Sequence, residues 1–250
     1  MDDIELLIDL HCDGLRQGPG GDGETRLAIE LSGLKPGTAL NIADIGCGTG
    51  ASTLVLATEL DAQITAVDFL PEFLTKLDTV AKQAGLEGNI TTHSASMEAL
   101  PFADAELDAI WSEGAIYNMG FEAGIKAWRR FLKPDGILAL SELTWLTDQR
   151  PEELTSHWEK EYPEVGTVSE KAAVLERLGF SLIGYFALPA HCWMDNYYNP
   201  MRHRFSAFLD RHDYSEGARA IVAAEEAEIS LYERHKAFVS YGYYVARKVG

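Results

Sequence analysis

The chain has 250 residues, a formal net charge of −18 and 46% hydrophobic residues, enough for one large core in a single domain. Such strong acidity would repel the phosphates of nucleic acids and of anionic membranes, so we expect neither as a partner. No apolar run reaches the roughly 20 residues that span a bilayer, and the acidic start differs from a basic secretory signal. We therefore expect a cytoplasmic protein. The three cysteines are far apart and show no metal-ligand spacing, so we expect no metal.

The first 37 residues predict two helices, near residues 4–10 and 25–34, joined by a glycine-rich loop at residues 16–23. This loop lies just ahead of the first predicted strand. We interpret it as a flap over a binding site, and a flexible connector is the alternative.

From residue 39 onward, short apolar runs alternate with helical patterns, which predicts an α/β fold with a parallel sheet covered on both faces. The predicted strands are residues 39–44, 64–68, 89–94, 107–112, 137–142, 180–188 and 241–247. Later helices are predicted at residues 152–161, 169–178 and 216–239. The stretch before the last strand is too long for a bare loop. We expect residues 190–240 to form a helical cap over a substrate, inserted within a single domain of residues 1–250.

The segment Asp44–Gly50 is a glycine turn between the first strand and a helix. Glycines there remove side chains that would hold a ligand away from the backbone, and the N–H groups of the new helix favour a polar or anionic group. The Asp44 carboxylate would repel a pyrophosphate and attract an ammonium or sulfonium. Gly46, Gly48 and Ala51 also satisfy the dinucleotide fingerprint. The glycines alone therefore leave a nicotinamide-dependent oxidoreductase open.

Parallel sheets bind ligands beyond the carboxyl ends of their strands. Asp68 ends the second predicted strand, where an acid can accept both hydroxyls of a ribose. Phe69 beside it would pack on an adenine. The same edge of the sheet is expected to gather Asp44, Asp68, Ser96, Ser112 and Glu142 around one crevice.

The glycine turn, Asp-Ile-Gly-Cys-Gly-Thr-Gly at 44–50, resembles the nucleotide-binding loop of class I S-adenosylmethionine-dependent methyltransferases. Residues 94–102 resemble the stretch in which that family holds the adenine amino group with an acid before Leu-Pro-Phe. Ser96 stands at the acidic position here, so the backbone of Ser96 and Met97 would read the adenine edge. Lys-Pro-Asp-Gly at 133–136 resembles the family's Lys-Pro-Gly-Gly turn.

Four further segments resemble a group of largely uncharacterised bacterial small-molecule methyltransferases; they are residues 16–20, 111–118, 188–193 and 241–244. The resemblance implies a Rossmann-like, seven-stranded, mostly parallel sheet whose last strand is antiparallel. It implies S-adenosylmethionine as cofactor and methyl transfer to a small-molecule acceptor, with a non-catalytic S-adenosylmethionine-binding protein as an alternative. The expected cofactor-binding residues are Arg16, Asp44, Gly46, Gly48, Gly50, Asp68, Phe69, Ser96, Met97 and Ser112.

Methyl transfer is an in-line displacement in which positioning carries much of the catalysis, and a base is needed only if the acceptor keeps its proton. Glu113 is the first candidate base, with Tyr117 to orient the acceptor, and His191 is the second candidate. Trp145, Trp193, Tyr197 and Tyr198 would form an aromatic wall for an apolar or cationic acceptor. Glu225, Glu226 and Glu228 are interpreted as helix surface. A homodimer is compatible with the sequence.

Overall fold

The structure is a computed structural model that describes residues 3–37 and 39–250. The α-helices are α1 (Asp3–Cys12), α2 (Asp22–Ser32), α3 (Ala51–Leu60), α4 (Pro71–Ala84), α5 (Phe121–Trp128), α6 (Glu152–Glu161), α7 (Val168–Arg177), α8 (Ala190–Trp193), α9 (Asn199–Arg211) and α10 (Glu216–His235). The strands are β1 (Asn41–Ile45), β2 (Gln63–Asp68), β3 (Ile90–Ser94), β4 (Leu107–Glu113), β5 (Leu132–Trp145), β6 (Gly166–Thr167), β7 (Phe180–Ala187) and β8 (Val239–Lys248). Short 3-10 turns cover Ile116–Asn118 and Arg129–Phe131, and a π-helical turn covers Met194–Tyr198.

The strands form one mixed sheet in the order β3-β2-β1-β4-β5-β8-β7. The pairs from β3 to β5 are parallel, and β8 runs antiparallel to both β5 and β7. This confirms the predicted sheet of seven strands with an antiparallel last strand. The sequence prediction lacked β6, whose two residues pair with the end of β5, because two residues carry no periodic pattern.

The predicted turn at residues 133–136 lies inside β5, which begins five residues earlier than expected. Leu107 pairs with Leu132, and the next pair joins Ala109 to Ile137, so the intervening residues form a bulge. Asp135 adopts a positive φ of 60° there. A bulge adds residues to one strand without ending the ladder, which is why the turn signal did not mark the start of the strand.

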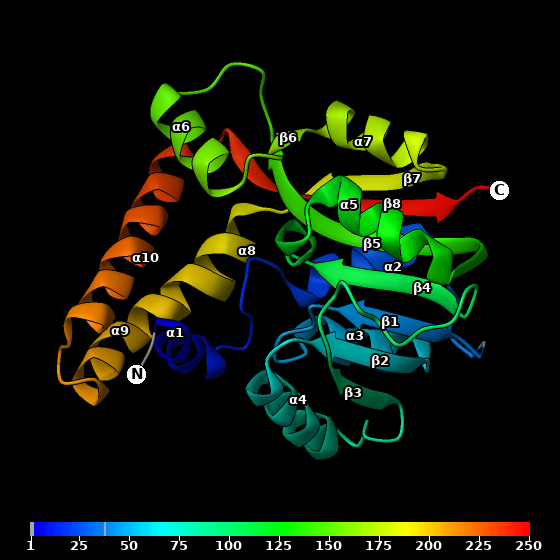
Figure 1. Cartoon of the computed structure of the whole chain (residues 1–250), viewed down its shortest axis with the longest axis horizontal. Helices are drawn as coiled ribbons and strands as arrows, with labels where there is room; N and C mark the ends of the chain where they lie inside the picture. The colour runs from blue at the N-terminus through cyan, green and yellow to red at the C-terminus, as the bar shows by residue number, and fades with distance from the viewer. Residues whose placement is uncertain (1–2, 38) are drawn as a thin grey trace.

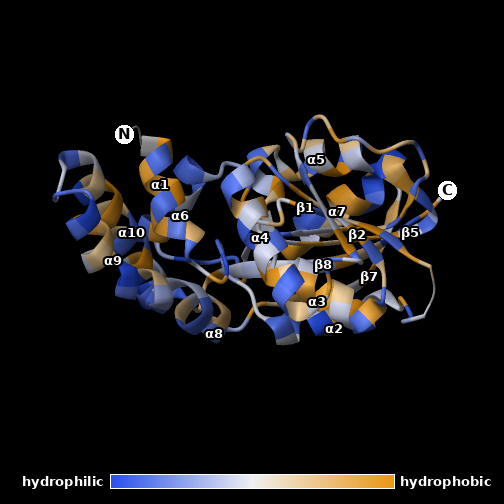
Figure 2. Cartoon of the chain, turned by 90° about the horizontal axis from the view of Figure 1, so that it is seen from below, coloured by the Kyte–Doolittle hydropathy of each residue, from blue (hydrophilic) through white to orange (hydrophobic). Residues whose placement is uncertain are grey.

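Helices cover both faces of the sheet (Figure 2), and the side chains of each strand alternate between these two faces. Ile110 and Leu138 pack on one face with residues of α5 and α7. Trp111 and Ala139, their chain neighbours, pack on the other face with α2, α3 and α4. This alternation with period two gives each face its own apolar core.

Helices α1, α6, α9 and α10, called the helical lobe below, gather at one end of the sheet (Figure 1). The lobe has a separate hydrophobic core that includes Leu10, Tyr198, Phe208 and Tyr232. The helical insertion before the last strand is thus confirmed. Helix α9 was missed, although its Met201, Phe205 and Phe208 follow helical spacing.

The predicted helix at residues 216–239 ends at His235, and the chain turns into β8 at Val239. Across the described residues, no helix combines the length and the apolar character needed to cross a membrane.

Candidate functional site

Two cavities adjoin at the end of the sheet that faces the helical lobe. The glycine-loop cavity measures about 610 Å³, and its wall includes Gly46, Gly48, Asp68, Phe69, Ser96, Met97, Glu113 and Tyr117. The lobe cavity measures about 580 Å³ and lies between the sheet end and residues of α6 and α10. The two share the wall residues Gln17, Gly18, Pro19, Gly114 and Tyr117. Both volumes suit small-molecule ligands, and the shared wall brings the two compartments into contact.

Contacts within the protein, as well as access for a ligand, explain why this turn contains glycine. Gly46 and Gly48 have φ of +71° and +55°, a region that side chains disfavour. A Cβ at Gly46 would clash with Ala115, and one at Gly48 would clash with the Gln17 amide. Gly50 lies outside the cavity wall, directly before α3. The turn therefore needs glycine partly because the N-terminal loop packs against it.

The loop at residues 13–21 is fastened to this turn through Gln17. The Gln17 Oε1 atom accepts hydrogen bonds from the backbone N–H and the hydroxyl of Thr49, at 2.9 and 3.1 Å. Its Nε2 donates to the carbonyl of Gly14 at 3.1 Å. The Asn196 amide donates to the carbonyl of Gly20 at 2.7 Å, which joins the loop to the insertion before β8. The loop thus connects the glycine turn to residues that follow β7.

Asp44 lies behind the glycine turn, outside the cavity wall. It is the penultimate residue of β1 and is 0% exposed. Its Oδ2 accepts hydrogen bonds from Ser52 and Thr53, at 2.8 and 2.7 Å. Burial raises the pKa of Asp44 to about 7, against the lowering effect of these hydroxyls. The Asp44 carboxyl group links α3 to the sheet through these hydrogen bonds. An electrostatic attraction between Asp44 and a bound cation would have to act through the glycine turn.

Seven of the ten predicted cofactor-binding residues come together in the wall of the glycine-loop cavity; they are Arg16, Gly46, Gly48, Asp68, Phe69, Ser96 and Met97. The Asp68 carboxylate accepts hydrogen bonds at 2.9 Å from the backbone N–H groups of Gly48 and Leu70. Burial raises the pKa of Asp68, while these backbone bonds lower it. Phe69 is 74% exposed although it is apolar, and Ser96 and Met97 belong to the same wall. An acid beside an exposed ring suits a ribose next to a base.

Ser112 does not reach either cavity. It is fully buried, and its hydroxyl donates to the carbonyl of Ile45 at 2.9 Å, which ties β4 to β1. The prediction that Ser112 lies near the carboxyl end of a strand was correct. Its side chain, however, bonds the neighbouring strand and does not face a cavity.

Glu113 and Arg16 form a partly buried ion pair in the wall of the glycine-loop cavity, 3.1 Å apart. The Glu113 carboxylate also accepts hydrogen bonds from Thr25, Trp111 and Tyr243. Four donors hold this carboxylate in place, which favours a role in positioning Arg16. Its predicted role as general base stays a prediction. Tyr117 contacts both cavities and meets Tyr162 edge to face, with ring centroids 6.2 Å apart.

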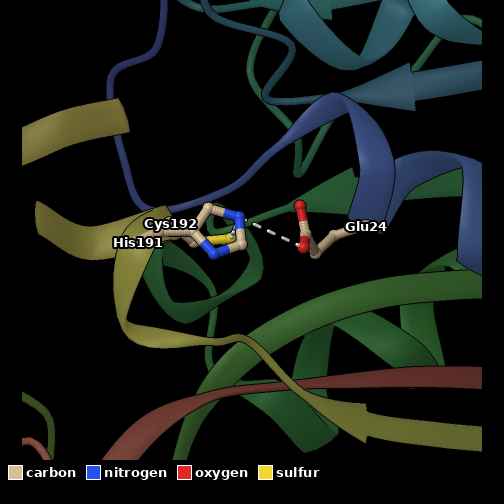
Figure 3. Close-up of side chains that lie close together, drawn as sticks. All are labelled: Glu24, His191 and Cys192. Atoms are coloured by element: carbon tan, nitrogen blue, oxygen red, sulfur yellow. Dashed lines mark hydrogen bonds and ion pairs between the residues drawn. The ribbon is translucent and has the colours of Figure 1, made fainter. Parts of the chain in front are cut away.

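His191 lies outside both cavity walls and points toward α2 (Figure 3). Its Nε2 is 3.4 Å from Glu24 Oε1 and 3.7 Å from the sulfur of Cys192. These three side chains offer ligand atoms within 4.8 Å of one another. Burial raises the pKa of the Cys192 thiol. The contact between His191 and Glu24 links α8 to α2.

Only part of the predicted aromatic wall lines the lobe cavity. Trp193 and Tyr197 are in that wall, whereas Trp145 and Tyr198 lie in the core behind it. This cavity is also lined by Glu225 and Glu228. The sequence analysis interpreted both residues as part of the helix surface. The sequence held a signal for this position: Glu225 and Glu228 precede the buried Tyr232 by seven and four residues, and residues at these spacings lie on the same face of a helix.

The comparisons with known proteins agree with this geometry. Residues 42–136, from β1 to the bulge of β5, match the family described as "Methyltransferase domain". The fold is similar to that of a SAM-dependent methyltransferase of Geobacter sulfurreducens, solved in complex with S-adenosyl-L-homocysteine, with a TM-score of 0.85, 16% identity and 98% of both chains covered. Residues 42–136 are thus similar to that family, and the chain as a whole has the fold of that solved methyltransferase.

Two curated relatives match parts of the chain. A 27-O-demethylrifamycin SV methyltransferase of Amycolatopsis mediterranei (strain S699) is 28% identical over 55% of this chain and 54% of the relative. A dimethylglycine N-methyltransferase of Parasynechococcus marenigrum (strain WH8102) is 33% identical over 40% of this chain and 36% of the relative. The chain thus matches about half or less of the length of these relatives. The nicotinamide-dependent and non-catalytic alternatives receive no support from these matches.

Proposed function

We propose that this chain binds S-adenosylmethionine in the glycine-loop cavity and transfers its methyl group to a small-molecule acceptor in the lobe cavity. The observation that carries the proposal is the shared wall at Gln17–Pro19, Gly114 and Tyr117, where the two cavities meet beside the glycine turn. Methyl transfer requires donor and acceptor to approach in line within one closed site. Two adjoining compartments of small-molecule size meet that requirement.

The residues of the glycine-loop cavity fit the parts of this cofactor. The Asp68 carboxylate would accept hydrogen bonds from the ribose hydroxyls, and Phe69 would stack on the adenine. The backbone groups of Ser96 and Met97 would form hydrogen bonds with the edge of the adenine. The Arg16 guanidinium, held by Glu113 and Asp22, keeps further N–H donors for the cofactor's carboxylate. The backbone at Gly46 and Gly48 would border the amino-acid portion.

When bound, the cofactor supplies a methyl group on a positively charged sulfur. The protein contributes position and the exclusion of water. We propose that Tyr117, at the junction of the cavities, orients the acceptor, and that Glu113 acts through Arg16. We further propose that residues 190–240 act as the cap and residues 16–23 as the flap that separate the reacting groups from solvent.

The identity of the acceptor is not given by the relatives. One curated relative is named for an oxygen of a rifamycin and the other for the nitrogen of dimethylglycine. Methyltransferase folds accept many substrates, so the acceptor must be argued from the lobe cavity itself.

The substitution Asp68→Ala tests the cofactor site. A hydrogen bond to a charged group contributes about 1.5–3 kcal/mol, so we expect calorimetry to show at least a tenfold loss of S-adenosylmethionine affinity with the circular dichroism spectrum unchanged. The matched control is Glu87→Ala, which removes an exposed acid on the loop before β3 and should bind as the wild type does. Unchanged affinity in Asp68→Ala would contradict the assignment.

The remaining expectations about partners are also proposals. The net charge of −18 disfavours nucleic acid and anionic membranes as partners, and a cytoplasmic location agrees with it. A homodimer is compatible with this account. Light scattering on the purified chain measures its mass directly and distinguishes a monomer from a dimer.

A further inference from the structure

The wall of the lobe cavity carries more acidic than basic side chains. Of the described residues in its wall, four are glutamates, at positions 142, 161, 225 and 228, and one is a lysine, Lys160. Lys160 pairs with Glu161 at 3.2 Å and its side chain is 83% exposed, so it belongs to the outer rim. Burial lowers the pKa of His157, the histidine of this wall, which keeps it neutral. The acidic groups of the interior are therefore Glu142, Glu225 and Glu228, and of these Glu225 lies 3.6 Å from His11.

Glu142 is the most deeply buried of these acids. It is 1% exposed, and its Oε1 accepts a hydrogen bond from the backbone N–H of Leu143 at 2.7 Å. Its Oε2 is buried and has no hydrogen-bond partner within the described part of the chain. The nearby Lys171 donates instead to the Tyr162 hydroxyl and the Glu164 carbonyl. An unpartnered buried carboxylate oxygen is costly, so a donor from a ligand would stabilise it.

Glu228 supplies a second carboxylate to the same cavity. It reaches inward from α10, where its Oε1 accepts a hydrogen bond from the Tyr198 hydroxyl at 2.8 Å. Burial raises the pKa of Glu228, and the neighbouring Glu225 adds to the effect. Negative charges that crowd in a partly buried space attract a positively charged ligand.

Aromatic rings complete the wall. They are Tyr117, Trp158, Tyr162, Trp193, Tyr197 and Tyr241. The indole Nε1 of Trp158 is buried without a hydrogen-bond partner among the described residues. Aromatic faces attract cations and also pack against apolar groups. Rings and carboxylates together select a ligand that is both cationic and partly apolar.

We propose that the methyl acceptor is an amine with an apolar body, held as a cation in the lobe cavity by Glu142, Glu228 and the surrounding rings. This inference rests on the proposed function and gives its acceptor class. Acids and phosphorylated compounds would bring negative charge next to Glu142 and Glu228, and a neutral alcohol would bring these two carboxylates no positive charge.

The chemistry of an amine acceptor gives Glu142 a defined task. An ammonium ion has no free electron pair, so it must first lose a proton, which passes to Glu142 Oε2. The nitrogen lone pair then forms the new N–C bond, while the C–S bond breaks and its electron pair stays on sulfur. Burial raises the pKa of Glu142 to about 7, with Lys171 opposing and Glu164 adding to the shift. A carboxylate with this pKa is a better proton acceptor than an exposed one.

The test compares two probes of similar shape, 2-phenylethylamine and 2-phenylethanol, by calorimetry at pH 8 on protein saturated with S-adenosylhomocysteine. We expect saturable binding of the amine, at least tenfold tighter than that of the alcohol. Glu142→Gln and Glu228→Gln should each weaken amine binding about tenfold and leave alcohol binding unchanged. Both glutamines keep an oxygen for the existing hydrogen bonds. Glu87→Gln is the matched control and should behave as the wild type.

Equal affinity for the two probes, no saturable amine binding, or amine binding unchanged in both variants would overturn the inference. In parallel, the same proteins without S-adenosylhomocysteine are titrated with S-adenosylmethionine. If only the inference about the acceptor is wrong, S-adenosylmethionine still binds. If the proposed function is wrong, S-adenosylmethionine does not bind. A kinetic readout follows once an amine is methylated: Glu142→Gln should lower kcat more than it changes KM for S-adenosylmethionine.

Discussion

Asp44 is the residue whose ionisation should give stability a clear pH dependence. Its pKa is raised from 3.8 to about 7 by burial. The folded state therefore binds more protons than the unfolded state between about pH 4 and pH 7, so this group's contribution to the free energy of unfolding falls as pH rises through that window. The full effect is on the order of 4 kcal/mol.

The substitution Asp44→Asn removes this titration and keeps an oxygen to accept from Ser52 and Thr53. We expect the Tm of the variant, relative to wild type, to increase steadily from pH 4.5 to pH 7.5 in calorimetric scans. The other buried acid with a similar shift, Glu142, titrates in both proteins and cancels in the difference. A Tm difference independent of pH would show that Asp44 ionises normally in the folded protein.

Individual site residues were predicted from their place on a strand, and the structure puts some of these side chains in a cavity wall and others behind it. Asp68 is the last residue of β2 and lies in the cavity wall. Asp44 is one residue short of the end of β1, and the alternation with Ala43 and Ile45 directs it toward α3. The residue type and its approximate position were readable in the sequence. The face of the sheet toward which a side chain points was harder to predict. Successive side chains of a strand point to opposite faces, so an error of one residue in the end of the strand reverses the predicted face.

Among the elements, the N-terminal loop at residues 13–21 should control access to the cofactor. Gln17 fastens it to the glycine turn, and Asn196 fastens it to the insertion before β8. The substitution Gln17→Ala removes the bonds to Thr49 and to the Gly14 carbonyl. We expect faster hydrogen exchange at the amides of residues 14–20, a weaker S-adenosylmethionine affinity, and little change in Tm, because the loop lies outside the main cores.

The control for this prediction is Gln83→Ala, an exposed glutamine on α4. Exchange in the loop and cofactor affinity should match wild type in that variant. If Gln17→Ala exchanged no faster in the loop than the control does, the loop would be held by other contacts and its role as a flap would fail.

Elements with strong local patterns were predictable, and those defined by distant contacts were not. The central strands follow apolar runs of ordinary length, and their predicted bounds agree with β2, β3 and β4 to within about one residue. Helix α9 begins with Asn199-Pro200 after an aromatic stretch, which obscured its start, although proline is compatible with a first helical turn. The two-residue β6 exists only because β5 extends far enough to pair with it.

At the scale of the whole molecule, the chain builds two cores on the two faces of the sheet and a third in the helical lobe. The glycine-loop cavity lies at the end of the sheet, and the lobe cavity lies between the sheet and the lobe. The sequence predicted the first site, because its motifs are local and ordered along the chain. Glu142, Glu228 and Tyr241 in the second site come from β5, α10 and β8, so only their packing brings them together.

We propose above all that the glycine turn of this chain binds S-adenosylmethionine. The most direct measurement is a calorimetric titration of the purified chain with S-adenosylmethionine, with NADH as the control ligand. We predict saturable binding of S-adenosylmethionine, one molecule per chain, and no binding of NADH. Binding of NADH alone, or no binding of S-adenosylmethionine, would contradict the claim.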